Sequence, residues 1–362
     1  MTATAGYKLG LRIAILDPES DSPAQQLANI KVVASLHDVS GLENIARMSN
    51  LLTLENEFVN APLLEHIESM GVPIYPTSRT VSLVQDKLFQ KQSLEANGID
   101  VPAFIEVSSQ NDILEAGERF GWPLILKARR NGYDGRGNEL INGPKEIPNS
   151  WTKLEGETRG LMVERFVRFR KELAVMVARS PNGEAVTYPV VETVQKNHIC
   201  HIVKAPANVT VAISERAGMM ARRAIEAVHG VGIFGLEMFL LDDDRILINE
   251  MAPRPHNSGH YTIEACITSQ FENHLRAILG LPLGAASMIL PAAVMVNLLA
   301  ARSGVSNISG VEKALRIPGV NLHIYGKKLT RPNRKMGHIT ALGASVEEAL
   351  EKAIKAASFI SF

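Results

Sequence analysis

Glu237 and Glu250 each interrupt a mostly apolar run, and a short polar turn separates the two runs. This pattern is typical of a β-hairpin. A two-residue turn centred on Asp243–Asp244 places Glu237 opposite Glu250 and Leu240 opposite Leu247. Carboxylates directly opposite each other repel unless a cation neutralises them, and hard divalent cations prefer such oxygen ligands. The pattern predicts a site for a phosphate-bound divalent cation. An exposed glutamate or another register is the alternative, which the apolar run around Glu237 disfavours.

A glycine-rich turn follows the predicted strand Leu124–Ala128, in which Lys127 lies near the end. The turn reads Gly132-Tyr-Asp-Gly-Arg-Gly-Asn138. Its glycines allow backbone N–H groups to approach a phosphate, and Lys127 and Arg136 supply positive charge. A flexible β-hairpin with solvated basic residues explains the same sequence equally well, so this motif alone does not distinguish a phosphate-binding turn from an ordinary hairpin.

A dense polar segment, Arg254-Pro-His-Asn-Ser-Gly-His260, begins just after Glu250. Its position beside a candidate metal site indicates a site loop, and Asn249 offers one more oxygen ligand. A packing or capping role is the alternative for His260. Arg254 is harder to explain in that way, because it lies so close to the two carboxylates.

A basic segment near the C-terminus contains Lys327, Arg331, Arg334 and Lys335. Several cations in one turn could bind a phosphate monoester. From composition alone, a solvated basic loop is the favoured interpretation.

The elements that must position these residues belong to an ordinary globular chain. It has 362 residues, and 38 Lys and Arg balance 38 Asp and Glu. Zero net charge argues against binding nucleic acid or anionic lipid through bulk charge. The length predicts two or three domains, and only two cysteines indicate a reducing, cytoplasmic setting. The uncharged stretch between Arg276 and Arg302 is interrupted by glycine and proline, so we interpret it as a helix end, a loop and the buried strand Ala292–Leu299 rather than a membrane span.

Short strands alternate with helices in the first 80 residues, which predicts a parallel α/β sheet. Its predicted strands are Leu11–Leu16, Lys31–Ser35, Leu51–Glu55 and Val72–Tyr75. Thr80–Asn97 is predicted as one amphipathic helix that ends at Gly98. A second segment begins near Pro102, and a smaller β-rich segment follows Pro291. The second segment's predicted elements are the helices Asp112–Phe120 and Ser214–Val228, and the strands Leu124–Ala128, Leu161–Glu164, Glu172–Val177, Ile233–Leu241 and Ile246–Met251.

Taken together, the motifs resemble one family over essentially the whole chain. They are Gly132–Gly137, Asn249–His260, Thr268–Phe271 and Arg334–His338, and they resemble 5-(carboxyamino)imidazole ribonucleotide synthetase, an ATP-grasp enzyme of purine biosynthesis. The resemblance implies an α/β, overall α+β, ATP-grasp fold. It implies an N-terminal parallel α/β domain over residues 1–88, an ATP-grasp domain over 89–290 and a small β-rich C-terminal domain over 291–362.

The implied activity is the carboxylation of 5-aminoimidazole ribonucleotide with bicarbonate, driven by ATP through carboxyphosphate. The implied cofactor is Mg²⁺, with Mn²⁺ as an alternative. An ATP-grasp ligase with another acceptor is a second hypothesis, and a non-catalytic or weakly active truncated nucleotide-binding protein is a third. A homodimer is expected. So is a separate or fused mutase, because the segment Val191–Cys200 most resembles the branch fused to a carboxylase/mutase domain.

The resemblance also implies roles for individual residues. Arg254 and His256 are the expected catalytic residues for bicarbonate and carboxyphosphate. Glu237 and Glu250 are the expected metal ligands. Glu55, Tyr133, Arg136, Lys327 and Arg334 are expected to bind the ribonucleotide. The expected ATP-binding residues are Lys87, Lys127, Gly132, Tyr133, Asp134, Gly135, Arg136, Gly137, Asn138, Glu164, Arg165, Phe166, Val167, Glu172, Gln195, Asn249 and Glu250.

Three features depart from the family pattern. Gln195 stands where a histidine is usual near the nucleotide. Asn56 and Phe58 replace a more usual aromatic and a polar residue around Glu55 and Glu57. The family begins with a strand and a Gly-Gly-Gly-Gln-Leu-Gly type loop before its first helix, and Thr2–Gly10 resembles that helix without them.

Overall fold

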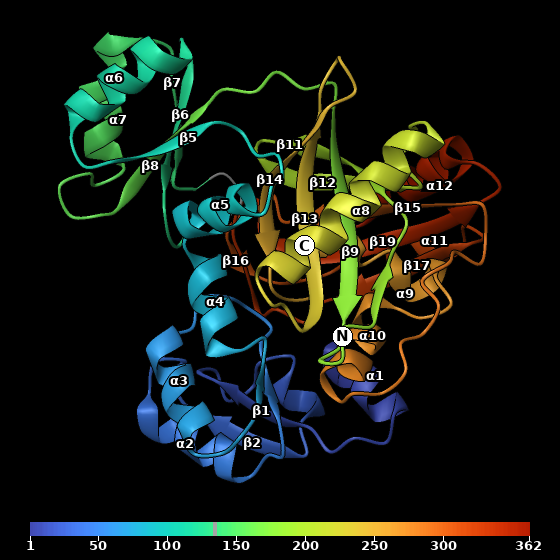
Figure 1. The fold of residues 1–362 in the computed structure, drawn as a ribbon. Helices are drawn as coiled ribbons and strands as arrows, with labels where there is room; N and C mark the ends of the chain where they lie inside the picture. The colour runs from blue at the N-terminus through green and yellow to red at the C-terminus, as the bar shows by residue number, and fades with distance from the viewer. Residues whose placement is uncertain (133–135) are drawn as a thin grey trace.

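The computed structural model describes residues 1–132 and 136–362. The chain forms an N-terminal lobe, a small lobe with a four-stranded sheet, and a body built on one large sheet (Figure 1). Three expected site residues, Tyr133, Asp134 and Gly135, lie outside the described residues. No helix in the described part of the chain is both long and apolar enough to cross a membrane.

The N-terminal lobe confirms the predicted parallel α/β pattern, although its strands form two small sheets. Strand β1 pairs with β2 in parallel, and β3 pairs with β4 in parallel. Alternating helices bury Leu64, Ile67 and Ile74 between them. The elements are α1 (Thr2–Lys8), β1 (Ala14–Asp17), β2 (Ile30–Val33), α2 (Val39–Arg47), β3 (Leu52–Thr53), α3 (Ala61–Ser69), β4 (Ile74–Tyr75) and α4 (Ser78–Gln85).

The predicted single helix Thr80–Asn97 is wrong, because the chain breaks it at Asp86. Helix α4 ends at Gln85 and α5 (Lys87–Ala96) begins directly afterwards. Asp86 has an extended backbone, and its side chain accepts a hydrogen bond from Leu88 N–H as the N-cap of α5. The break makes Lys87 the first residue of a new helix.

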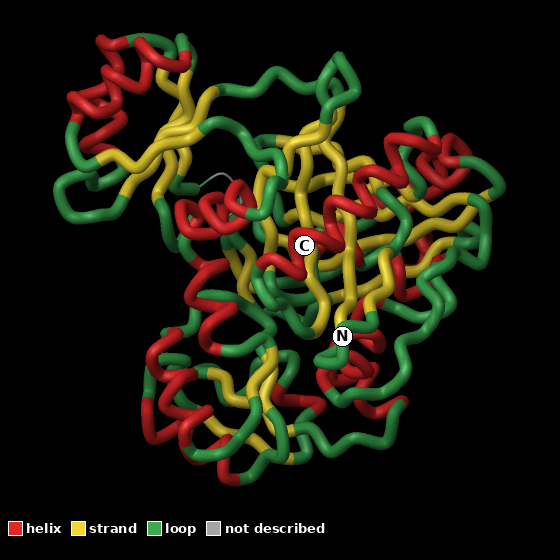
Figure 2. The backbone as a smooth tube through the Cα atoms, in the orientation of Figure 1, coloured by secondary structure: helices red, strands yellow, loops and turns green. Residues whose placement is uncertain are grey.

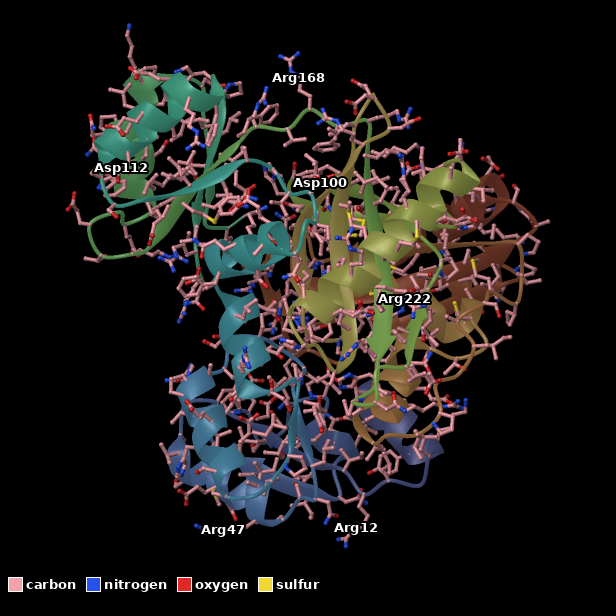
Figure 3. All side chains as sticks on the ribbon, in the orientation of Figure 1. Arg12, Arg47, Asp100, Asp112, Arg168 and Arg222 are labelled. Carbon is pink, nitrogen blue, oxygen red and sulfur yellow. The ribbon has the colours of Figure 1, made fainter. Side chains whose placement is uncertain are left out.

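The small lobe is an antiparallel sheet in the order β5-β8-β6-β7, backed by two helices (Figures 1 and 2). Helix α6 contributes Ile113 and helix α7 contributes Trp151 to one core with Leu124 and Leu126 of the sheet. In Figure 3 the labelled Asp112 marks the first turn of α6, where it forms a capping box with Ser109. The elements are β5 (Phe104–Val107), α6 (Gln110–Phe120), β6 (Leu124–Ala128), β7 (Asn138–Ile141), α7 (Ile147–Lys153) and β8 (Leu161–Arg165).

The body is a nine-stranded sheet in the order β14-β13-β9-β11-β12-β15-β19-β17, with β10 paired to β9. Helix α8 packs Ala217, Ala221 and Ile225 against one face of it. The strands are β9 (Lys171–Arg179), β10 (Ala185–Thr187), β11 (Val191–Lys196), β12 (Ile199–Ala205), β13 (Gly232–Leu240), β14 (Ile246–Ala252), β15 (Ala292–Leu299), β17 (Val320–Ile324) and β19 (Lys335–Gly343). The helices are α8 (Val211–Ala227), α9 (Thr262–Ala265), α10 (Gln270–Ile278), α11 (Val311–Leu315) and α12 (Val346–Phe359).

The predicted buried strand at 292–299 is confirmed as β15. It pairs with β12 on one side and with β19 on the other. The sheet therefore continues without a gap across the predicted domain boundary at residue 290. The domain limits themselves stay a prediction.

His274 on α10 joins the N-terminal lobe to the large sheet. Ile233 N–H donates to its Nδ1 at 3.1 Å, and its Nε2 lies 2.7 Å from Thr53 Oγ1 of β3. Burial lowers the pKa of His274 to about 4 from the ordinary 6.5. The neutral ring is therefore the form that the fold accommodates.

Acid should weaken this contact. Because the folded pKa is below the unfolded value, the unfolded chain binds the proton first, and the stability is present above pH 6.5 and lost as pH falls towards 4. The shift corresponds to about 3 kcal/mol. We expect the urea midpoint to fall more between pH 7.5 and pH 4.5 in the unaltered chain than in His274→Gln. Equal falls in both proteins would show that His274 does not carry this pH dependence.

Candidate active site

The two glutamates lie opposite each other on β13 and β14. The pairing of Glu237 with Glu250 is confirmed, but the predicted pairing of Leu240 with Leu247 is wrong, because Leu240 pairs with Ile246. The turn is longer than two residues, since Leu241 N–H donates to the Arg245 carbonyl at 2.9 Å. A register shift after Glu237 leaves Asn249 as an extra residue on β14, a β-bulge that restores the carboxylate pairing.

The turn residue Asp244 has a φ of 64°, the left-handed conformation found in three-residue hairpin loops. The longer turn shifts the strand register by one residue, and the bulge shifts it back, so Glu237 still pairs with Glu250. Bulges are frequent beside active sites because they redirect a side chain.

Positive charge reaches the two carboxylates unequally. Lys87 pairs with Glu250, whereas Lys87 and Lys335 influence Glu237 less than burial and the charges of Glu250 and Glu172 do. Burial, followed by the charges of Glu250 and Glu172, raises the pKa of Glu237 to about 8. For Glu250 burial acts in the same direction, but the ammonium of Lys87 outweighs it and lowers the pKa to about 2. Of the two carboxylates, Glu237 is therefore the one that holds a proton more readily. Two opposed carboxylates, of which only Glu250 forms an ion pair with Lys87, fit a hard divalent cation.

The break at Asp86 positions Lys87 over the pair. Lys87 N–H donates to the Arg129 carbonyl at 2.8 Å, and its ammonium forms an ion pair with Glu250. Asp86 is buried and holds the guanidinium groups of Arg129, at 2.8 Å, and Arg130, at 3.1 Å. These bonds attach the start of α5 to the end of β6, and a Cβ on Gly132 would lie 3.7 Å from Lys87 Cε, so Lys87 lies beside Gly132.

A second ion-pair cluster is fully buried behind the first. Glu164 Oε2 lies 2.8 Å from Lys127 Nζ, and Glu164 Oε1 lies 3.1 Å from Lys91 Nζ. Lys127 also donates to Asn249 Oδ1 at 3.2 Å, and Lys91 donates to the Asn249 carbonyl at 3.0 Å. Burial is the largest influence on Lys91 and lowers its pKa to about 8. The Glu164 side chain therefore points to lysines, and any reading of adenine by Glu164–Val167 would fall to their backbone groups.

Arg254 lies on the loop after β14 and contacts the N-terminal lobe. It forms a bidentate ion pair with Glu57, in which Nε donates to Oε2 and Nη2 donates to Oε1 at 2.9 Å. Glu55 and Glu250 also lie close enough to Arg254 to favour its charged form. The pair joins the N-terminal lobe to the body, so the expected ribonucleotide residue Glu55 and the expected bicarbonate residue Arg254 are brought together.

His256 lies beside the carboxylate of Glu237. Its Nε2 is 3.6 Å from Glu237 Oε1, and its Nδ1 is 2.8 Å from Ser258 Oγ. Gln270 fixes its backbone through two hydrogen bonds, of 3.0 Å to its N–H and 2.8 Å to its carbonyl. Burial, followed by the charge of Arg254, lowers the pKa of His256 to about 3. A neutral imidazole therefore faces the carboxylates.

The remaining expected residues surround this centre at different distances. Glu172 acts electrostatically on Glu237, and its pKa is raised by burial, which a hydrogen bond with Gln195 partly offsets. Arg165 and Phe166 are exposed at the end of β8. Gly137 has a φ of 82°, and a Cβ there would lie 3.3 Å from Ala128 Cβ, so this turn needs glycine. Gly132, Arg136 and Asn138 lie on the described ends of the same turn.

The basic segment also approaches the centre. Lys327 Nζ donates to the Lys335 carbonyl at 2.7 Å, and Arg334 Nη1 donates to the Leu329 carbonyl at 2.7 Å. Lys335 acts electrostatically on both Glu237 and His256. The segment therefore adds positive charge to the edge of the site.

Reasoning from the sequence missed three residues of this centre. They are Asp86, Lys91 and Glu57. Lys91 follows Lys87 by four residues, so both lie on one face of α5, and that spacing could have indicated a second inward lysine. Nothing local marks Asp86 or Glu57, because their arginine partners are distant in sequence.

Comparison with known proteins agrees with this layout. Residues 1–85 match a ribonucleotide synthetase preATP-grasp domain, residues 92–271 match an ATP-grasp domain, and residues 293–352 match a phosphoribosylaminoimidazole carboxylase C-terminal domain. An N5-carboxyaminoimidazole ribonucleotide synthase from Synechococcus elongatus is 39% identical over 98% of this chain and 89% of its own length. The chain belongs to the N5-carboxyaminoimidazole ribonucleotide synthase family. The expected ATP-grasp fold, with its preATP-grasp and C-terminal domains, is thereby confirmed.

Two further relatives bear on the site. A crystal structure of N5-carboxyaminoimidazole synthase from Aspergillus clavatus, in complex with ADP and 5-aminoimidazole ribonucleotide, superposes with a TM-score of 0.89. It is 35% identical and covers 99% of this chain and 95% of that one. A phosphoribosylaminoimidazole carboxylase from Schizosaccharomyces pombe is 43% identical over 96% of this chain. The chain spans 64% of that relative's length.

Proposed function

We propose that this chain carboxylates the 5-amino group of 5-aminoimidazole ribonucleotide, using ATP and bicarbonate, in purine biosynthesis. The observation that carries the proposal is the carboxylate pair Glu237–Glu250, with Lys87 on one side and Arg254 and His256 on the other. Membership of the synthase family supports the substrates, since a relative of similar fold is in complex with ADP and 5-aminoimidazole ribonucleotide.

The proposed reaction proceeds in two steps. A bicarbonate oxygen attacks the γ-phosphorus of ATP, which gives carboxyphosphate and ADP. The 5-amino nitrogen then attacks the carboxyl carbon, or the CO₂ released from it, and inorganic phosphate leaves as the amine loses a proton. Phosphoryl transfer needs chiefly positioning and neutralisation of charge. Lys87 and Lys127 supply positive charge for the nucleotide phosphates.

The residues present fit the expected Mg²⁺, or Mn²⁺ in its place. Glu237 and Glu250 would hold the ion, since their carboxylates lie directly opposite each other and only Glu250 forms an ion pair with Lys87. When bound, the ion would neutralise charge on the transferred phosphoryl group and polarise its oxygens. Asn249 is occupied by the two lysines instead, through its side-chain oxygen and its carbonyl.

Arg254 and His256 suit the carboxyphosphate part of the reaction. A guanidinium has five N–H donors, and in Arg254 Nε and Nη2 hold Glu57 while Nη1 donates to the Pro255 carbonyl. The remaining N–H groups on Nη1 and Nη2 are the donors that we assign to bicarbonate. Burial lowers the pKa of His256 to about 3, so its ring is neutral at pH 7. Its Nδ1 accepts from Ser258 N–H, which leaves the ring hydrogen on Nε2, the nitrogen that faces Glu237. We propose that this Nε2–H donates to carboxyphosphate.

Lys327 and Arg334 are proposed to bind the ribonucleotide phosphate. Lys327→Ala and Arg334→Ala should each raise the KM for 5-aminoimidazole ribonucleotide by roughly 10- to 150-fold, because a hydrogen bond to a charged group is worth about 1.5–3 kcal/mol. The KM for ATP should change little. Lys328→Ala removes a neighbouring cation that pairs with Asp21 and is the matched control. A shift in the ATP KM instead would place the segment at the nucleotide.

The proposed activity is tested by phosphate release from ATP. Release should require both bicarbonate and 5-aminoimidazole ribonucleotide. An equal rate without the ribonucleotide, or with a different amine acceptor, would favour another ATP-grasp ligase. No turnover with any acceptor, but retained nucleotide binding, would favour a non-catalytic protein.

The proposal also covers the cellular compartment, the oligomeric state and a partner enzyme. We propose a cytoplasmic homodimer, and a mutase that consumes the carboxyamino product, either separate or fused. The fused arrangement is supported by the fungal relative, which is longer than this chain.

A further inference from the structure

Helix α5 covers the free edge of the large sheet beside the carboxylates. Within the described residues, strand β14 is the terminal strand of that sheet, so its outer backbone groups pair with no strand there. Three α5 side chains contact three consecutive residues of β14. Lys91 bonds the Asn249 carbonyl, Lys87 pairs with Glu250, and the Gln90 amide bonds both the N–H and the carbonyl of Met251. An edge strand is thus satisfied by side chains instead of a neighbouring strand.

Lys91 differs from Gln90 in a further contact. Its ammonium shares Glu164 with Lys127, and all three side chains are almost completely inaccessible to solvent, at 2% for Lys91, 3% for Glu164 and 8% for Lys127. With Lys127 alone, Glu164 would form a neutral pair. With both lysines, the buried trio carries one net positive charge, so Lys127 is only partly neutralised.

We propose that Lys91 is a positioning residue for nucleotide binding, which shares Glu164 and fixes the Asn249 bulge so that Lys127 stays placed and electrostatically available for the phosphates. This inference rests on the proposed function only in taking Lys127 as a phosphate-binding lysine. Lys91 is the more deeply buried of the two lysines, with 2% of its side chain exposed against 8% for Lys127, and we assign the phosphate contact to Lys127 alone. It acts through Glu164 on one side and through Asn249, the neighbour of Glu250, on the other.

Lys91→Met tests the proposal by direct binding of ATP and ADP with Mg²⁺, without turnover. We expect the Kd for ATP to rise at least tenfold, since Glu164 would then pair with Lys127 alone. Gln90→Met is the matched control. It is buried on the same helix, and the variant loses two bonds to β14, but the hydrogen bonds of Gln90 in the described structure go to Val84 and Met251 and not to Glu164 or Lys127. Equal Kd values in the two variants, at equal melting temperature, would overturn the proposal.

A double variant separates positioning from simple structural support. Adding Glu164→Gln to Lys91→Met removes the charge that would neutralise Lys127, so ATP binding should recover at least threefold. A further loss of affinity in the double variant would mean that Lys91 only supports the fold, and would contradict the proposal. If the proposed carboxylation is wrong, the unaltered chain will release phosphate at a rate that does not depend on 5-aminoimidazole ribonucleotide. That result would not change the outcome of these ATP-binding experiments.

Discussion

Glu250→Gln is expected to lower turnover by about 10³-fold while the protein remains folded, because removal of one preorganised charged group from a reacting phosphate has effects of this order. The substitution keeps the side chain's shape and still offers an oxygen to Lys87. It removes one of the two charges that would hold the metal ion beside Glu237. Steady-state phosphate release, measured across a range of Mg²⁺ concentrations, reports the change.

The control for this variant lies in the same hairpin. Asp243→Asn also removes one carboxylate charge, but at an exposed turn where Asp243 pairs with Arg245. It should leave turnover unchanged. Near-normal turnover of Glu250→Gln at saturating Mg²⁺ would exclude Glu250 as a metal ligand.

Arg254→Met should lower kcat by about 10²–10³-fold and change the KM for ATP by less than about threefold, because Arg254 is proposed to address bicarbonate rather than the nucleotide. The substitution leaves Glu57 without its guanidinium partner. A second variant, Arg254→Met with Glu57→Gln, removes that unpaired charge and should restore stability without restoring kcat. Arg245→Met, an exposed arginine from the neighbouring turn, is the control. Recovery of kcat in the double variant would assign Arg254 a purely structural role.

Local pattern predicted some elements of the site well. The glutamate pairing was predictable because apolar residues flank both carboxylates on short strands, and one hairpin register satisfies both. The turn length and the Asn249 bulge were not. Each shifts the register by one residue, and because the shifts cancel at Glu250, the sequence pattern contains no sign of either.

Tertiary ion pairs account for most of what the sequence could not predict. The helix break at Asp86 is stabilised by Arg129 and Arg130 from another lobe, so helical periodicity across the break remains intact in the sequence. Glu57 is matched to Arg254 only after the N-terminal lobe packs against the body. Such contacts depend on how the lobes pack and not on local propensity.

The most direct test of the account uses bicarbonate labelled with ¹⁸O. Formation of carboxyphosphate joins a bicarbonate oxygen to the γ-phosphorus, and attack on the carboxyl carbon leaves that oxygen on phosphate. In the presence of ATP, Mg²⁺ and 5-aminoimidazole ribonucleotide, the account predicts inorganic phosphate that carries one ¹⁸O atom, together with an equal amount of the carboxyamino product. Phosphate that carries oxygen from water alone would show that ATP is hydrolysed without activating bicarbonate, and would contradict the account.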